Sequence, residues 1–444
     1  MDLKNIAEQV IKICRKKGAD EAEAYLVSSR ELSLEVRNGE IESVQEASSY
    51  GLGLRVIKDK KLGFAYVNDF RPEGLEEVIR RALELARAVT ADENNVLPDD
   101  PRISEVKGLY DPQLTRIPMD KKISLAKEVE EMATQVKGIT KSAGASYGES
   151  EEEIVLANSH GLIKSYKASG CGYGVGVIAE KGEQKSAGYE SCQRRFYHDL
   201  RPASEIARKA AQKALEMLDP KPVKTQRASV IFDPDVAYAI LGGIIQAVNG
   251  ESVLQGASFL GKKLGQKIAS ELISIIDDGT LEKGLASAPF DGEGVPTQKR
   301  LIVEKGVLRG FLYNTYAAQR AGVKSTGNAV RGGFSSLPGI GPHNFYIANG
   351  STRPDDIIAA TDRGVLVKEV TGYGINPVNG HFSGGASGLW IENGRVAFPV
   401  KGITIAGTAE EMLFGIDMLG DDLDLNRSRT APTLRIKSLQ IGGE

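Results

Sequence analysis

The sequence contains few of the residues that most often build metal and redox centres. Its 444 residues include three cysteines and four histidines, and neither an HExxH nor a CxxC spacing occurs. The scattered cysteines, Cys14, Cys171 and Cys192, do not suit a disulfide framework. No helical turn holds two of the histidines, which are His160, His198, His343 and His381. We therefore expect each histidine to be structural rather than a metal ligand.

Long apolar runs and long basic runs are also missing. No segment approaches the roughly 20 apolar residues of a membrane span. The first residues alternate charged and apolar side chains, as a surface helix does, and lack the apolar stretch of a signal peptide. The net charge is −3, and Asp59 interrupts the densest basic segment at 58–61. We expect a cytoplasmic protein that binds neither membrane nor nucleic acid.

The common motifs of nucleophilic catalysis and of nucleotide binding are absent too. There is no GxSxG elbow and no P-loop, and GCGYGVG (170–176) lacks the GxGxxG spacing. DDLDLN (421–426) has the spacing that opens a calcium loop, but Arg427 and Thr433 stand where glycine and glutamate are required. The residues alone therefore show no recognisable catalytic site.

The clearest positive feature is an internal repeat before residue 220. The first copy predicts a helix at about 3–17, a strand at 24–27, a hairpin at 33–44 turning at Asn38-Gly39, strands at 51–57 and 62–67, and a helix after Arg71-Pro72. The second copy predicts a helix at 119–136, a hairpin at 152–166 turning at His160-Gly161, strands at 172–178 and 186–189, and a helix after Arg201-Pro202. GLGLRVI (51–57) matches GYGVGVI (172–178), and GFAY matches SAGY. The two repeats, about 1–90 and 119–218, predict an N-terminal α+β domain at 1–219.

The second half, 227–444, predicts a strand-rich and largely antiparallel α+β domain behind a polar linker at 219–227. Hairpin turns are expected at Lys305-Gly306 and Asn393-Gly394, and helices at about 354–362 and 408–418. The glycine-rich stretch 322–341 is too irregular for a core element, and loops of this length often carry function. The fold class is α+β, with a duplicated helix-hairpin-helix unit followed by this domain.

One predicted helix carries an unusual centre. Residues 233–250 read DPDVAYAILGGIIQAVNG, in which Asp233-Pro234 is a start signal and Asn249-Gly250 a stop signal. Gly242 and Gly243 lie between them, although each glycine costs about 1 kcal/mol relative to alanine inside a helix. We expect these small residues to let another element approach closely.

Several long motifs of the second half resemble the TldD/PmbA family, whose members are also labelled modulators of DNA gyrase. The motifs are IIDDGT (275–280), APFDGEGVPTQKRLIVEKGVLRGFLYN (288–314), STGNAVR (325–331), VNGHFSGGASGLWIENGRVAFPVKGITIAGT (378–408) and MLGDDL (418–423). The duplicated unit, with RNGEIESV, also resembles the family's first domain. The resemblance covers nearly the whole chain, in the family's order.

The family has two branches that pair. TldD-like chains carry a zinc-binding His-Glu-x-x-x-His helix and a cysteine near the C-terminus, whereas PmbA-like chains, also called TldE, lack them. The resemblance puts the ligand and base positions at Gly242, Gly243 and Ala247, none of which has a donor atom. The segment of the C-terminal cysteine corresponds to a shortened NRSRTAPTL (426–434). The nearby polar residues do not recreate the ligand set; these are Gln246, Asn249 and Glu251.

The resemblance therefore implies a PmbA/TldE-like subunit that has no catalytic residue and no metal of its own. Its expected partner is a TldD-like chain that holds the zinc, and the heterodimer would cleave peptides or unfolded segments in an enclosed cavity. Without that partner the chain could form a homodimer. Asn328, Arg331 and His343 are the candidate substrate contacts, because polar groups on a glycine-rich loop can present donors to an extended peptide.

Two alternatives stay open at the level of sequence. The chain could be a stand-alone or homodimeric metallopeptidase with a relocated metal site that uses His343, His381 and nearby carboxylates, and it would then hold stoichiometric zinc. Alternatively, it could be a regulatory binding protein that acts on gyrase or DNA, as the family label suggests. The near-neutral charge without a basic patch argues against direct DNA binding.

Overall fold

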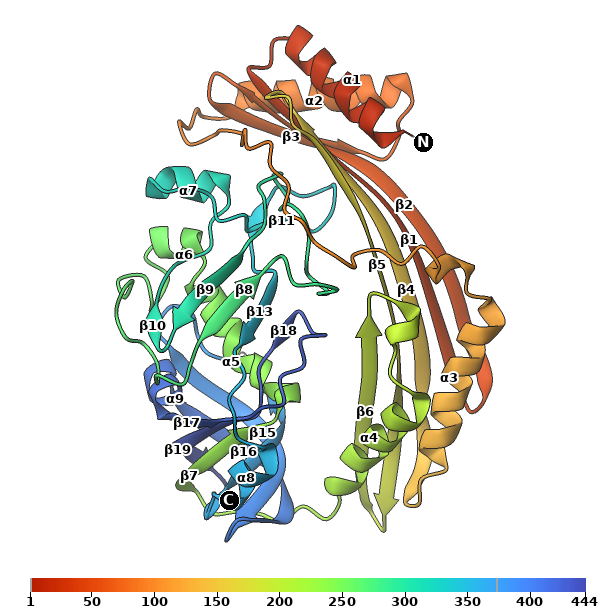
Figure 1. Cartoon of the computed structure of the whole chain (residues 1–444), viewed down its shortest axis with the longest axis vertical. Coiled ribbons are helices and arrows are strands. Elements are labelled where there is room, and N and C mark those ends of the chain that lie inside the picture. The colour runs from red at the N-terminus through yellow and green to blue at the C-terminus, as the bar shows by residue number, and fades with distance from the viewer. Residues whose placement is uncertain (1, 373) are drawn as a thin grey trace.

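The computed structural model describes residues 2–372 and 374–444, and its N-terminal part consists of two successive units of the same order (Figure 1). The first unit comprises α1 (Leu3–Lys16), β1 (Glu21–Arg37), β2 (Glu40–Lys58), β3 (Lys61–Val67) and α2 (Pro72–Ala88). The second comprises α3 (Met119–Thr134), β4 (Ile139–Asn158), β5 (Ile163–Lys181), β6 (Gln184–Arg194) and α4 (Ala203–Glu216). All six strands form one antiparallel sheet in the order β3-β2-β1-β4-β5-β6.

The strands of this sheet are much longer than the sequence predicts. The expected short strands at 24–27 and 33–37 are a single strand of 17 residues, and β2 likewise runs unbroken for 19 residues. The predicted breaks are wrong because serine and glutamate on one face interrupt the apolar pattern without interrupting the backbone ladder. The hairpin turn at Asn38-Gly39 is confirmed, and both residues have positive φ values as such a turn requires.

All four helices of the N-terminal part cover the same face of the long sheet. Along β1, Ala22 and Leu26 pack with residues of α1 and α2, whereas Leu34 and Val36 pack with residues of α3 and α4. These β1 residues all have even numbers, and side chains two apart point to the same face of a strand. The opposite face, which we call the inner face, is therefore free to meet the rest of the chain.

In each copy of the internal repeat, one helix packs directly against a glycine of the third strand. A Cβ atom at Gly63 of β3 would overlap the backbone of α2 at Ala82, and one at Gly188 of β6 would overlap the backbone of α4 at Ala210. Gly63 and Gly188 are therefore equivalent in the structure. The sequence match of GFAY (63–66) with SAGY (186–189) pairs Gly63 with Ser186 instead, so its alignment is wrong by two residues. Glycine is required at both places because the helix lies directly on the strand.

The C-terminal part is built around two further sheets. Its strands are β7 (Gln226–Phe232), β8 (Ile275–Asp278), β9 (Lys299–Glu304), β10 (Val307–Leu308), β11 (Ala329–Val330), β12 (Gly339–Ile340), β13 (Asn344–Ile347), β14 (Arg363–Thr371), β15 (His381–Glu392), β16 (Arg395–Thr408), β17 (Ile416–Leu419), β18 (Arg429–Thr430) and β19 (Leu434–Gly442). Its helices are α5 (Pro234–Ala247), α6 (Gly250–Leu254), α7 (Thr315–Ala321), α8 (Pro354–Ala359) and α9 (Ala409–Gly415). The predicted α+β class with mainly antiparallel strands is confirmed.

The larger C-terminal sheet closes on itself. Its order is β16-β15-β14-β7-β19-β17, and β16 also pairs with β19, so five strands complete a ring. The smaller sheet has the order β10-β9-β8-β13-β18. One hydrophobic core joins α5 to residues of both sheets, which places this helix between them. In the ranges 2–372 and 374–444, no helix is long and apolar enough to cross a membrane.

The C-terminal part meets the inner face of the long sheet through the segment 331–336. A Cβ atom at Gly51 of β2 would overlap the ring of Phe334, and one at Gly53 would overlap the carbonyl oxygen of the same residue. The ring of Tyr66 on β3 stands edge-on to Phe334, with 6.2 Å between the ring centroids. The glycines of the GLGLRVI strand therefore make room for a residue that lies almost 300 positions away in the sequence.

This arrangement predicts coupling between Gly51 and Phe334. Gly51→Ala should lower the free energy of unfolding by about 1–3 kcal/mol, since its methyl group must displace the ring. In a Phe334→Ala background the same glycine substitution should cost far less, because the overlapping ring is gone. Urea unfolding of the four proteins of this double-mutant cycle measures the coupling, and strictly additive effects would show that the ring does not rest on Gly51.

Candidate functional site

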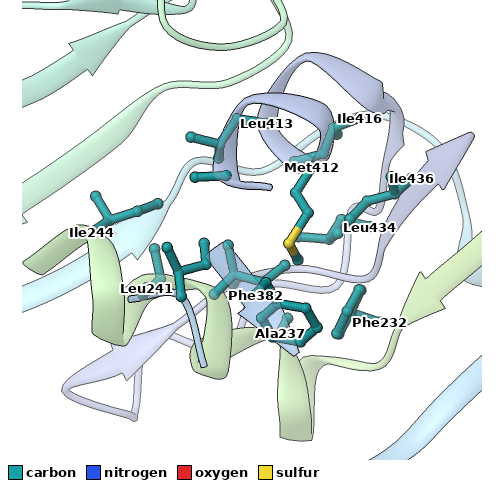
Figure 2. Close-up of a cluster of buried hydrophobic side chains, with 14 of the residues drawn as sticks. Phe232, Ala237, Leu241, Ile244, Phe382, Met412, Leu413, Ile416, Leu434 and Ile436 are labelled. Carbon is teal, nitrogen blue, oxygen red and sulfur yellow. The ribbon is translucent and has the colours of Figure 1, made fainter. Parts of the chain in front are cut away.

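Helix α5 has the start that its sequence predicts and ends close to the predicted stop. The Asp233 side chain accepts a hydrogen bond from the Asp235 N–H, and Pro234 occupies the first helical position. The helix ends at Ala247, and Asn249 then caps the short helix α6 through the N–H groups of Glu251 and Ser252. Ala237, Leu241 and Ile244 point from α5 into the core between the two sheets (Figure 2).

The two central glycines of α5 have opposite surroundings. Gly243 is buried, and a Cβ atom there would overlap the backbone and side chain of Ile375. The expected close approach is therefore confirmed at Gly243. It is wrong at Gly242, which is exposed and would have no other atom within 4 Å of an added Cβ. Tyr238 and Gln246, one turn before and after Gly242, are exposed on the same side of the helix.

The family's zinc does not fit the donors that this helix presents. Gly242, Gly243 and Ala247 offer no side-chain oxygen, nitrogen or sulfur, and Ala247 is completely buried. Gln246 is the nearest polar side chain on the helix, and an amide is not among the usual zinc ligands. Across the described residues, no three His, Cys, Asp or Glu side chains lie close enough together to hold a metal ion. His343 and His381 thus form no such group in this part of the chain.

The cysteines all lie in the N-terminal part of the chain. Cys14, Cys171 and Cys192 are buried in the two cores of the N-terminal part, and burial raises the pKa of Cys14 and of Cys171 to about 12. Such thiols stay protonated at neutral pH, whereas a metal ligand must be a thiolate.

The shortened segment 426–434 instead packs against the start of α5. Arg427 pairs with Asp235, which also pairs with Lys213 of α4 at 2.5 Å. Burial by itself would raise the pKa of Asp235, but the charges of Lys213 and Arg427 outweigh it and lower the pKa to about 2. Arg427 therefore ties the segment 426–434 to the start of α5, and Lys213 ties α4 to the same carboxylate.

Asn328 and His343 belong to a buried hydrogen-bond network within the C-terminal part. Asp277 of β8 accepts hydrogen bonds from the Asn328 amide and from the His343 N–H, each at 2.7 Å. The Nε2 atom of His343 lies 2.7 Å from the carbonyl oxygen of Gly327, and the Asn328 amide also donates to Gly341. Asn328 is fully buried and His343 is 7% exposed. The network fixes the two ends of the glycine-rich stretch to the sheet.

Arg331, the third candidate contact, holds the N-terminal and C-terminal parts together. Its guanidinium pairs with Glu23 of β1, donates to the carbonyl oxygens of Gly292 and Ser336, and lies over the Tyr25 ring with 4.6 Å to the ring centroid. Only 1% of its side chain is exposed. The structure therefore brings Arg331 into the junction between the two parts.

A second arginine completes this junction. Arg55 of β2 pairs with Glu23 at 2.7 Å and with Glu293 of the C-terminal part at 2.8 Å. The four side chains, Glu23, Arg55, Glu293 and Arg331, are at most 7% exposed, and we call them the ionic clamp. Three of them, Glu23, Arg55 and Glu293, are not among the candidate residues that the sequence indicates. A signal existed in Arg55, which is the one charged residue in GLGLRVI and corresponds to Gly176 in the second copy.

A small cavity adjoins the ionic clamp. Its volume is about 370 Å³, and it is lined by Tyr25, Tyr166 and Phe290 together with Arg331 and His343. Asn328 does not reach it, being enclosed by the network around Asp277. Contact of these residues with a peptide stays a prediction, since the three candidate side chains already have partners within the chain.

The contrast between the two glycines of α5 gives a matched pair of variants. Gly242→Ala should raise the free energy of unfolding by about 1 kcal/mol, because alanine favours the helix and the added methyl group meets no atom. Gly243→Ala should lower it by about 1–3 kcal/mol, because the methyl group must push away the segment at Ile375. Urea unfolding measures both, and equal effects of the two substitutions would contradict this packing.

The ionic clamp predicts a large effect of Arg331→Ala on stability. The substitution removes one of the two arginines that neutralise the buried Glu23, and breaking a buried pair typically costs about 3–5 kcal/mol. Arg353→Ala is the control, since Arg353 pairs with Asp356 on the surface and should change stability little. Thermal unfolding compares the variants, and similar melting temperatures would refute the role of the clamp.

Comparison with known proteins agrees with this architecture. The models of the PmbA/TldA metallopeptidase match in three pieces: domain 1 at residues 22–86, the central domain at 112–218 and the C-terminal domain at 225–443. Metalloprotease PmbA of Escherichia coli O157:H7 is 31% identical over 434 residues, which cover 96% of this chain and 93% of that protein.

Two further relatives cover the full length as well. A PmbA homologue of Haemophilus influenzae is 31% identical over 445 residues, which cover 100% of this chain and 96% of that protein. The crystal structure of TldE from Thermococcus kodakarensis superposes with a TM-score of 0.91 at 30% identity and covers 99% of this chain and all of that one. The chain belongs to the PmbA/TldD family of metallopeptidase-related proteins.

Proposed function

We propose that the chain is a non-catalytic, PmbA/TldE-like subunit of a heteromeric metallopeptidase. The observation that carries the proposal is helix α5, where the family's ligand and base positions correspond to Gly242, Gly243 and Ala247. Peptide hydrolysis by zinc needs three protein ligands and a general base, and these residues supply neither. The zinc and the base would come from a TldD-like partner.

The packing around α5 supports the same proposal. Ile375 occupies the space that a side chain at position 243 would need, so a glutamate there would require the segment around Ile375 to move. The segment 426–434 is held against the start of α5 by the ion pair of Arg427 with Asp235. Both features make the helix a packed structural element. The names PmbA and TldE of the full-length relatives point to the same branch.

In this proposal the chain forms part of the wall of an enclosed space in a peptide-cleaving complex and stabilises its partner. Its partner is a second polypeptide with the His-Glu-x-x-x-His helix, and its substrates are peptides or unfolded segments that can enter an enclosed space. The long sheet has all four N-terminal helices on one face, and the part of its inner face that the C-terminal part does not cover is available for such a space.

Coexpression with a TldD-like chain tests the proposal. We expect the two chains to copurify, with zinc and chelator-sensitive peptidase activity present in the pair and absent from this chain alone. The matched control is the same pair in which the partner's two helix histidines are replaced by alanine. That pair should still assemble but lose both zinc and cleavage.

Two results would contradict the proposal. Failure of the chains to copurify would remove the subunit role. Stoichiometric zinc and peptide cleavage in this chain alone would instead favour a stand-alone peptidase with a different metal site.

A further inference from the structure

Half of the inner face of the long sheet is not covered by the C-terminal part. Glu31, Ser33 and Glu35 of β1 are exposed, although β1 is a central strand with β2 and β4 on either side. A groove of about 790 Å³ lies over this half. We call it the inner groove. It spans β1, β2, β4, β5 and β6, and Arg195 and Leu285 lie at its end near the C-terminal part.

Small and polar residues form the floor of the inner groove in rows that cross the strands. The middle row is Gln45, Ser33, Gly148, Gly172 and Gln193. The rows on its two sides are Ser43, Glu35, Ser146, Gly174 and Ser191, and Ala47, Glu31, Ser150 and Gly170. Because none of these residues is large and apolar, an extended chain can lie close to the backbone of the sheet.

The first unit of the repeat shows what kind of segment this face accepts. Gly172 and Gly174 of β5 correspond to Gly51 and Gly53 of β2, on which Phe334 lies. The atoms nearest to an added Cβ at Gly172 or Gly174 belong to β6, and they include the side chain of Gln193 at Gly172 and the hydroxyl group of Tyr189 at Gly174. The second copy therefore keeps the glycine surface of the first, while the described residues place no segment of the chain upon it.

The charges of the inner groove favour a cationic occupant. Glu31, Glu35 and Glu152 have side chains on the inner face, and none of the three forms an ion pair within the described ranges. Arg194 lies at the β6 end, and the buried Arg195 is engaged with carbonyl oxygens of Ser169 and Gly284. The exposed carboxylates of Glu31 and Glu35 thus stand in the middle of the floor without a counter-charge.

We propose that the inner groove binds an extended, cationic peptide segment, whose backbone lies across the serine and glycine rows while lysine or arginine side chains meet Glu31 and Glu35. A large side chain of the segment lies near Gly172 and Gly174, against the side chains of Gln193 and Tyr189. This inference rests on the proposed function, because it identifies the class of substrate that the chain presents within the complex.

Peptide binding by the isolated full-length chain tests the proposal. The probes are three fluorescein-labelled unstructured peptides that share a phenylalanine and differ only in having lysine, glutamine or glutamate at the charged positions. We expect the lysine peptide to bind most tightly and to weaken as salt rises, since exposed ion pairs are screened. Fluorescence anisotropy gives the affinities.

Variants of the chain locate the binding. Glu31→Gln combined with Glu35→Gln should weaken the lysine peptide about tenfold, as expected for the loss of two partly exposed ion pairs. The charge-matched control combines Glu8→Gln with Glu76→Gln on the helices of the opposite face, and it should bind like the wild type. Ser146→Trp should block the groove by bulk, and because Ser146 is exposed its melting temperature should stay unchanged.

The outcomes separate this inference from the proposed function. Equal affinity for all three peptides, or equal effects of the two double variants, would overturn it. A change of oligomeric state in Glu31→Gln/Glu35→Gln without a change in peptide affinity would also overturn it and assign the groove to a second copy of the chain. Copurification with zinc in the absence of groove binding would refute the inference alone, whereas groove binding without copurification would refute the subunit role alone.

Discussion

The ionic clamp is the contact on which the rest of the structure depends. Glu23 and Arg55 come from the long sheet, Glu293 and Arg331 come from the C-terminal part, and two of their ion pairs cross between the parts. Removing charges from water is costly, so a buried network stabilises only an arrangement that brings every charge to its partner. The clamp therefore specifies one placement of the two parts. Phe334 then lies on β2, and the other half of the inner face is left uncovered.

Much of the fold could be predicted from local sequence signals. The caps of α5, the turn at Asn38-Gly39 and the duplicated order of elements all follow from short-range chemistry. The length of β1 could not be predicted from the alternation of apolar and polar residues. That alternation depends on which elements cover each face of the strand, and these elements change along β1. The two-residue error in aligning GFAY with SAGY also comes from tertiary contacts. The contact of Gly188 with α4 determines which residues of β3 and β6 are equivalent, whereas the sequence match aligned their tyrosines.

The candidate site was harder to predict for a different reason. Asn328, Arg331 and His343 looked like exposed loop residues, because glycine and polar residues surround them in the sequence. Their partners Asp277 and Glu23 are about 50 and 300 positions away, and no periodicity reports such contacts. The two glycines of α5 show the same limit at closer range. They are neighbours in the sequence, but only the packing of Ile375 distinguishes a required glycine from a dispensable one.

The duplication of the long sheet has a consequence for how the two copies can change. On the inner side of the first copy, Gly51 and Gly53 pack against Phe334 of the C-terminal part. A larger side chain at either glycine would disturb the joint, by which we mean this contact between the two parts. The equivalent glycines of the second copy, Gly172 and Gly174, carry no segment of the described C-terminal part, although Tyr166 and Arg195 of that copy do contact it. The exposed residues of the groove floor, such as Ser33 of the first copy and Ser146 of the second, can vary without loosening the joint. The joint thus fixes the surface around Gly51 and Gly53, whereas the exposed surface around Ser33 and Ser146 is free to adapt to whatever the molecule meets.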